Sequence, residues 1–201
     1  KGFLRGDQYA VALALVEKGE VVIGVLGCPN LPFDNKNPEK GKGCLFVAVK
    51  GQGAIIRPLD NDEEAEIQVD PSSQPENAVF CESVESGHSS HDDHAKIAGL
   101  LRVTAPPYRI DSQCKYAAVA HGDASIYLRL MTYRSWIWDQ AAGAIIVEEA
   151  GGTVTDMDGK PLDFLQGRRL QGNSGVIATN GKLHEEVLAA VQKAIAHELH
   201  E

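Results

Sequence analysis

Cysteine is scarce in this sequence of 201 residues, and the four cysteines form no recognisable metal or redox motif. They stand at positions 28, 44, 81 and 114, with no C-x-x-C pair and no zinc-like spacing to a histidine. Disulfide frameworks are typical of small secreted domains in oxidising compartments. We therefore expect four reduced thiols and a cytoplasmic or organellar location. A regulatory disulfide stays open, because spacing alone does not reveal one.

The sequence also lacks long apolar runs and clusters of basic residues. No segment approaches the length needed to span a bilayer, and the net charge is -9. A protein that binds nucleic acid usually carries a basic face. We therefore expect neither a membrane nor a nucleic acid as partner. An anionic small ligand would need local cations or bound metal ions to overcome the overall field.

An initiator methionine is absent as well. The chain begins Lys1-Gly-Phe-Leu-Arg-Gly6, which is neither a signal peptide nor a transit peptide. We expect the native N-terminus to lie upstream, where a targeting signal would be outside this sequence. Hydrophobic residues make up 43% and charged residues 23%, as in ordinary globular proteins.

The first third of the sequence reads as antiparallel sheet. Its predicted strands are apolar runs separated by turn residues: 9–16, 21–26, 44–49, 53–56 and 67–69. The run 9–16 also fits a helix, but Gly19 and the β-branched residues after it favour a hairpin. A polar loop is predicted at 29–43.

From about residue 75, strands and helices alternate as in an α/β layer. The predicted strands are 78–81, 108–110, 124–130, 153–155 and 175–179. The predicted helices are 91–101, 113–121, 139–150 and 183–199. We therefore divide the chain into an antiparallel-sheet part, 1–75, and an α/β part, 76–201.

The strongest chemical signal surrounds Asp139. The sequence W-D-Q-A-A-G places this carboxylate where a loop becomes a helix, and E-A-G-G over 149–152 ends that helix. Small residues in the first turn let a ligand approach the backbone. A helix N-cap, which stabilises by about 1 kcal/mol, and a metal ligand are equally favoured for Asp139. Glu148 is assigned to solvent and Glu149 to loop packing, without a catalytic role.

The pattern from Trp138 to Gly152 resembles the second signature of the inositol-monophosphatase superfamily in residue types and in spacing. In that family the aspartate binds a catalytic magnesium ion and contacts the substrate, so the resemblance assigns both roles to Asp139. It also implies the family's α/β fold, a layered α-β-α-β-α sandwich.

Other segments resemble the 3'(2'),5'-bisphosphate nucleotidase branch of that superfamily: 1–15, 27–31, 85–92, 110–116 and 122–129. The likeness runs nearly end to end. It implies that His88 contacts the bound nucleotide, and that Ser112 and Lys115 lie beside the base and the phosphate that is not cleaved. Arg129 matches an arginine that contacts phosphate or base.

Each of these four residues also has an ordinary interpretation. His88 fits a loop residue, Ser112 a helix cap and Lys115 a solvated helix lysine. Arg129 fits one half of a surface ion pair. Lysine and arginine nevertheless suit an uncleaved phosphate, because their charge is permanent. Only the combination of the four residues favours a functional role over these ordinary interpretations.

The resemblance places the family's other magnesium ligands upstream, in and before a D-P-I-D-G-T motif that would directly precede Lys1. Asp139 alone is a poor magnesium site. We therefore expect an N-terminal segment of the same protein as a partner, either clipped off or removed by truncation. Its helices would cover the apolar face of the strands at 9–56. The expected fold is the family sandwich without its first helices.

Together these inferences predict a magnesium-dependent hydrolase that converts adenosine 3',5'-bisphosphate to AMP and phosphate, with 3'-phosphoadenosine 5'-phosphosulfate as a second substrate. The segments K-G-F-L-R-G and G-H-S-S-H favour it over an inositol monophosphatase or an inositol polyphosphate 1-phosphatase. A non-catalytic nucleotide-binding fragment is the alternative of a different class, since the chain keeps the expected phosphate contacts without the metal cluster.

Overall fold

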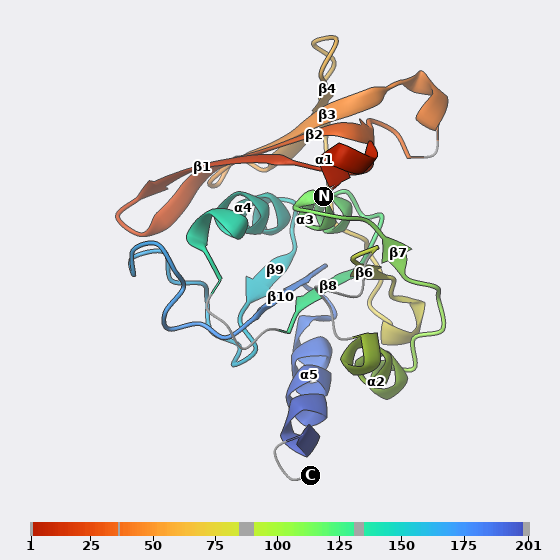
Figure 1. Cartoon of the computed structure of the whole chain (residues 1–201), viewed down its shortest axis with the longest axis vertical. Helices are drawn as coiled ribbons and strands as arrows, with labels where there is room; N and C mark the ends of the chain where they lie inside the picture. The colour runs from red at the N-terminus through yellow and green to blue at the C-terminus, as the bar shows by residue number, and fades with distance from the viewer. Residues whose placement is uncertain (1, 36, 85–90, 131–134, 199–201) are drawn as a thin grey trace.

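The computed structural model describes residues 2–35, 37–84, 91–130 and 135–198 (Figure 1). Two five-stranded sheets, called sheet A and sheet B here, are the main features. Four short helical turns accompany them: α1 (Gly2–Arg5), η1 (Pro38–Lys40), η2 (Pro75–Asn77) and η4 (Ile137–Asp139). No helix among the described residues is long and apolar enough to cross a membrane.

Sheet A is antiparallel throughout, with its strands in chain order. They are β1 (Val11–Glu17), β2 (Glu20–Pro32), β3 (Lys42–Val49), β4 (Ala54–Pro58) and β5 (Ala65–Glu66). The turn between β1 and β2 has positive φ at both residues, 51° at Lys18 and 85° at Gly19. This pair is the signature of a type I′ hairpin, whose twist matches that of the strands. The hairpin prediction is thus confirmed, and the helix over 9–16 is excluded.

Sheet B is mixed, in the order β7-β6-β8-β10-β9. Its strands are β6 (Phe80–Glu82), β7 (Tyr108–Arg109), β8 (Ile126–Arg129), β9 (Thr153–Thr155) and β10 (Val176–Thr179). β6 runs parallel to β7 and β8, and β10 runs antiparallel to β8 and β9. The longer helices are α2 (His91–Leu101), α3 (Cys114–Ala120), α4 (Ala141–Glu149) and α5 (His184–Glu198).

The elements stack in four layers (Figure 1). Helices α3 and α4 lie between the two sheets, and α2 and α5 lie on the far side of sheet B. Gly24 of β2 permits the close approach of α4, since a Cβ there would lie 2.3 Å from the Ile145 side chain. Gly143 does the same between α4 and the ring of Tyr116. The order β-α-β-α is the predicted sandwich without its first helical layer.

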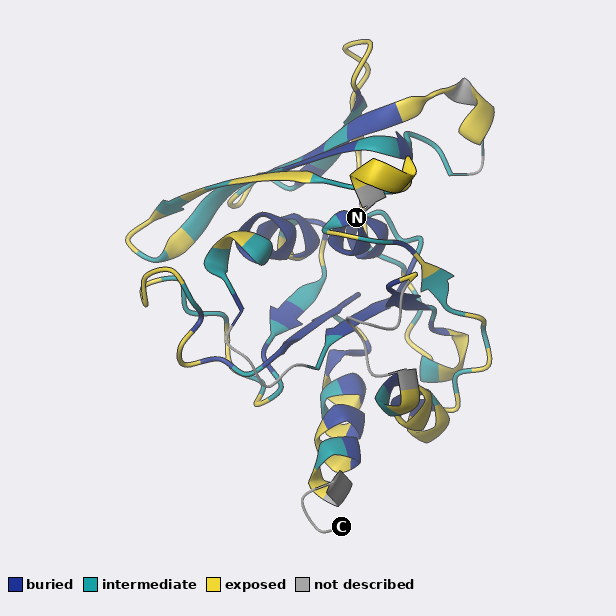
Figure 2. Ribbon diagram, in the orientation of Figure 1, coloured by how far each residue is buried: buried dark blue, intermediate teal, exposed yellow. Residues whose placement is uncertain are grey.

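The outer face of sheet A is apolar and has no cover among the described residues. The strand register aligns four apolar side chains on this face: Leu13, Val25, Val47 and Ile55. On β1, Val11, Leu13 and Leu15 remain 64%, 66% and 47% exposed, and Figure 2 shows β1 exposed along most of its length. The predicted apolar face is present, and its cover stays a prediction.

Some predicted boundaries are wrong. The short strand is Ala65–Glu66 rather than 67–69, because the chain leaves sheet A there and Val69 N donates to Ala150 O at the end of α4. Asp139 is not the N-cap of α4. Its N–H donates to Trp136 O and that of Gln140 to Ile137 O, so Asp139 sits inside a 3₁₀ turn and Gln140 occupies the cap position.

The division at residue 75 stays a prediction. The boundary falls at η2, between the last strand of sheet A and the first strand of sheet B. The apolar layer between the two sheets draws side chains from both parts. The two parts therefore share one core layer.

Candidate functional site

The Asp139 carboxylate has no partner among the described residues. Asp139 is the last residue of η4 and is half-buried, and its carboxylate makes no hydrogen bond or ion pair with the part of the chain that the structure describes. Carboxylate oxygens suit Mg²⁺, so Asp139 fits one ligand position. No group of three or more His, Cys, Asp or Glu side chains that could hold a metal occurs in the described ranges. A magnesium site at Asp139 would therefore need ligands beyond the described residues.

Lys115 is a buried cation on α3. It is 7% exposed, its Nζ donates to Ser83 Oγ at 3.1 Å, and it lies 5.5 Å from the ring centroid of Tyr127. Within the described ranges, no carboxylate lies at ion-pair distance from Nζ. The alternative of a solvated helix lysine is therefore wrong. A buried charge without a counter-charge is costly, and an anionic ligand would remove that cost.

Two tyrosines connect Lys115 to Asp139 and Arg129. The Tyr127 ring, beneath Lys115, packs edge-on against Tyr116 with centroids 5.0 Å apart. The Tyr116 hydroxyl donates a hydrogen bond to Oε1 of Gln140, the residue that follows Asp139 in the chain. Burial raises the pKa of Tyr116 well above its usual value; Tyr127 and Asp139 raise it further, and Arg129 lowers it. Tyr116 therefore stays a neutral hydrogen-bond donor.

Ser112 lies at the entrance to α3 in an unusual conformation. Its φ is 63°, which is uncommon for a residue with a Cβ. Its Oγ accepts a long hydrogen bond of 3.4 Å from Cys114 N, and the side chain is exposed. The N-cap position belongs to Gln113. Ser112 is therefore not the N-cap residue of α3. Its hydroxyl lies beside the first residue of that helix, Cys114, about one turn before Lys115.

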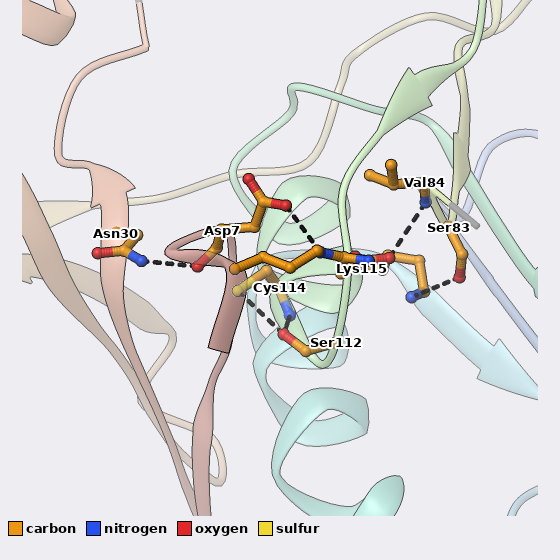
Figure 3. A network of polar contacts seen from close by, with 9 residues as sticks. Asp7, Asn30, Ser83, Val84, Ser112, Cys114 and Lys115 are labelled. Carbon is orange, nitrogen blue, oxygen red and sulfur yellow. Dashed lines mark hydrogen bonds and ion pairs between the residues drawn. The ribbon is translucent and has the colours of Figure 1, made fainter. Parts of the chain in front are cut away.

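Asp111 ties three distant segments together beside Ser112. Its Oδ1 accepts from Val84 N at 3.1 Å, just after β6, and its Oδ2 accepts from Arg5 Nη2. Arg5 also bonds Asp7 through Nε at 3.0 Å. Asn30 of β2 donates to Asp7 O at 2.6 Å (Figure 3). The start of the chain is thereby held against the segments that carry Ser112 and Lys115.

Lys115 thus lies against Tyr127, Arg129 follows two residues later on β8, Asp139 precedes the Gln140 that bonds Tyr116, and Ser112 lies at the start of α3. His88 lies outside the described residues. Three further residues join the arrangement although they were not among the predicted site residues: Arg5, Ser83 and Tyr116. Arg5 meets Asp111 across 106 positions of sequence. Only Tyr116 carries a local signal, since it directly follows Lys115.

The remaining predictions for this region concern the cysteines and two glutamates. All four cysteines are free and buried, as predicted, and burial raises the pKa of Cys44 to about 12. Glu149 accepts from Gly51 N and Gly53 N, both at 2.8 Å. Its predicted role in loop packing is confirmed, and Glu148 is exposed.

Comparison with known proteins gives a consistent family. A model of the inositol monophosphatase family matches residues 1–196. The 3'(2'),5'-bisphosphate nucleotidase of Emericella nidulans is 48% identical over 212 residues, which cover 97% of this chain and 60% of that protein. The 3'(2'),5'-bisphosphate nucleotidase 1 of Arabidopsis thaliana is 51% identical over 208 residues, covering 98% and 59%.

Among solved structures, an IMPase from Thermotoga maritima matches with a TM-score of 0.67 at 28% sequence identity. The match covers 94% of this chain and 62% of that chain. The chain thus spans 60% or slightly less of the curated relatives described above. The similarity extends over nearly all of it.

Proposed function

The chain belongs to the inositol monophosphatase family, a family of metal-dependent phosphatases, and we propose that the protein is a magnesium-dependent 3'(2'),5'-bisphosphate nucleotidase. It hydrolyses adenosine 3',5'-bisphosphate to AMP and phosphate, with 3'-phosphoadenosine 5'-phosphosulfate as a second substrate. The names of relatives at 48% and 51% identity support this proposal. The four free thiols support a reducing compartment, cytoplasmic or organellar.

The observation that carries the proposal is the buried ammonium group of Lys115. It meets a hydroxyl group and an aromatic ring but no carboxylate among the described residues. A bisphosphate substrate has a second phosphate that the reaction leaves intact. That phosphate would supply the missing negative charge, in a water-poor place where a charge-assisted hydrogen bond is strong.

Each predicted site residue then has a defined task. Asp139 contacts the substrate and serves as one magnesium ligand. Lys115 and Arg129 hold phosphate with charges that do not change during the reaction, and Ser112 and His88 contact the nucleotide. When bound, magnesium would lower the pKa of an attacking water molecule and neutralise charge on the phosphoryl oxygens.

An N-terminal segment of the same protein is the proposed partner of this chain. Two observations support it. Asp139 offers a single carboxylate where a magnesium site needs several oxygen ligands. The outer face of sheet A also exposes an apolar surface that a folded protein normally covers. One segment with acidic ligands and apolar helices would satisfy both.

The test is phosphate release by the full-length protein from adenosine 3',5'-bisphosphate and from inositol 1-phosphate, with magnesium and with EDTA. We expect magnesium-dependent turnover with kcat/KM higher for the bisphosphate by about tenfold or more, the value of one charge-assisted hydrogen bond. Preference for inositol 1-phosphate would identify an inositol phosphatase instead. Nucleotide binding without turnover would identify a non-catalytic binding protein.

A further inference from the structure

An arginine and two tryptophans form a stack that ends one residue before Asp139. The guanidinium carbon of Arg169 lies 3.6 Å from the ring centroid of Trp136. Trp136 stacks in turn on Trp138, with centroids 4.8 Å apart and an interplanar angle of 10°. These are the only tryptophans of the 201-residue sequence. The stack therefore joins the loop before β10 to the residue next to Asp139.

Backbone pairing fixes the base of this stack. Ile137 N donates to Arg168 O at 3.1 Å and Leu170 N donates to Ser135 O at 3.0 Å. Trp136 and Arg169 face each other in the resulting antiparallel bridge. The register of the bridge therefore places the Arg169 side chain beside the Trp136 ring.

The two residues at the other end of the segment, Trp138 and Asp139, present their side chains differently. Trp138 is 51% exposed, and the Asp139 carboxylate has no hydrogen bond or ion pair within the described ranges. Its direction is set by the 3₁₀ turn, whose bonds are Asp139 N to Trp136 O at 3.2 Å and Gln140 N to Ile137 O at 3.1 Å. Both bonds are accepted by carbonyl groups inside the segment that the stack covers, those of Trp136 and Ile137.

We propose that Arg169 is a positioning residue for Asp139. It clamps Trp136, Trp136 holds Trp138, and the rigid W-I-W turn holds the carboxylate where a magnesium ion and the substrate meet it. A preorganised ligand needs no reordering when the ion binds. This inference rests on the proposed function, because it takes Asp139 as the metal ligand.

The test compares Arg169→Met, Arg169→Lys and the neighbouring control Arg168→Met in the full-length protein. Arg168 is exposed, and its backbone carbonyl keeps its hydrogen bond whatever its side chain. The first readout is the circular dichroism of the coupled indoles, with Trp136→Phe as the baseline without a stack. The second is the magnesium concentration at half-maximal rate, together with kcat.

We expect Arg169→Met to lose the coupled indole signal, to lower kcat about tenfold and to raise the half-saturating magnesium concentration by a similar factor, within the range of a cation–π contact. Arg169→Lys keeps the charge but not the planar guanidinium. It should lie between, with changes of about threefold, and serves as the test if Arg169→Met does not fold. Arg168→Met should match the unmodified protein.

Two outcomes overturn the proposal. One is an Arg169→Met protein that keeps the indole signal. The other is one that loses the signal yet keeps kcat and the magnesium dependence of the unmodified protein. Failure of the proposed function would look different, because the unmodified protein would then prefer inositol 1-phosphate or bind nucleotide without turnover, whatever the state of the stack.

Discussion

The outer face of sheet A and the surroundings of Lys115 depart from the usual distribution of polarity in opposite directions. On the outer face, apolar side chains such as Leu13 meet water, with 66% of that side chain exposed. Beside Tyr127, the Lys115 ammonium group is almost fully buried and, among the described residues, meets Ser83 and an aromatic ring but no carboxylate. Folded proteins normally bury the first kind of group and pair or solvate the second.

The described residues thus lack a different partner at each region. The outer face of sheet A fits a partner that covers a broad apolar surface, because hydrophobic stabilisation grows with the apolar surface removed from water. Lys115 fits a partner that brings negative charge to one point. Five substitutions and one comparison of chain lengths test whether the regions depend on separate partners.

The largest effect should come from removing any upstream segment. We expect the chain 1–201 by itself to have no phosphatase turnover, because Asp139 is a single ligand and the described residues contain no group of three or more His, Cys, Asp or Glu side chains that could hold a metal ion. Turnover should return when the N-terminal segment is supplied. The measurement is phosphate release by material whose mass confirms a chain of 201 residues. Robust magnesium-dependent turnover by that chain would contradict the proposed ligand set.

Asp139→Asn should lower kcat of the full-length protein by about a hundredfold to a thousandfold, the loss seen when a key electrostatic contact to a reacting group is removed. The amide cannot offer magnesium a negative oxygen. The measurement is phosphate release in buffer freed of metal and repleted with magnesium. Asp62→Asn is the control, because the Asp62 side chain is 97% exposed. Normal rates in Asp139→Asn would exclude the metal role.

Lys115→Ala and Arg129→Ala should raise KM for adenosine 3',5'-bisphosphate about tenfold to a hundredfold, as expected for the loss of one charge-assisted hydrogen bond. Because the charge acts equally on ground and transition states, kcat should change less. Inositol 1-phosphate has no second phosphate, so whichever residue holds that phosphate should matter little to it. Equal losses on both substrates would refute bisphosphate selectivity. Exposed Lys193 provides the control, Lys193→Ala.

Leu13→Gln tests the apolar face. In the full-length protein we expect the free energy of unfolding to fall by about 1–2 kcal/mol, because a covering segment would bury this side chain. In the chain 1–201 the same change should cost less than about 0.5 kcal/mol, as for other surface positions. Denaturant unfolding of both lengths gives the comparison. Equal losses in the two would mean that nothing covers this face.

The smallest effect should come from Lys115→Met without ligand. Replacing a buried, unpaired charge by an apolar side chain of similar length should raise the free energy of unfolding by about 1 kcal/mol, while substrate affinity falls. Thermal unfolding with and without adenosine 3',5'-bisphosphate measures both. A less stable Lys115→Met protein without ligand would show that Lys115 serves the fold rather than an anion.

Sequence patterns predicted most elements because their causes are local. The turn at Lys18-Gly19 needs two positive φ values, which identifies the hairpin. Helix α2 begins and ends where it was predicted, His91–Leu101. The start of α4 was missed by two residues, because a 3₁₀ turn over Ile137–Asp139 precedes it and no local pattern separates the two helix types.

The sequence by itself determined the order of strands and helices, the apolar character of β1 to β4 and the family. Only the tertiary structure decided that Lys115 is buried rather than solvated, since a lysine on a short helix reads the same in either place. It also decided that Arg5 meets Asp111 and that Arg169 meets Trp136. These contacts join residues far apart in the chain, and only the packing of the sheets and helices brings such residues together.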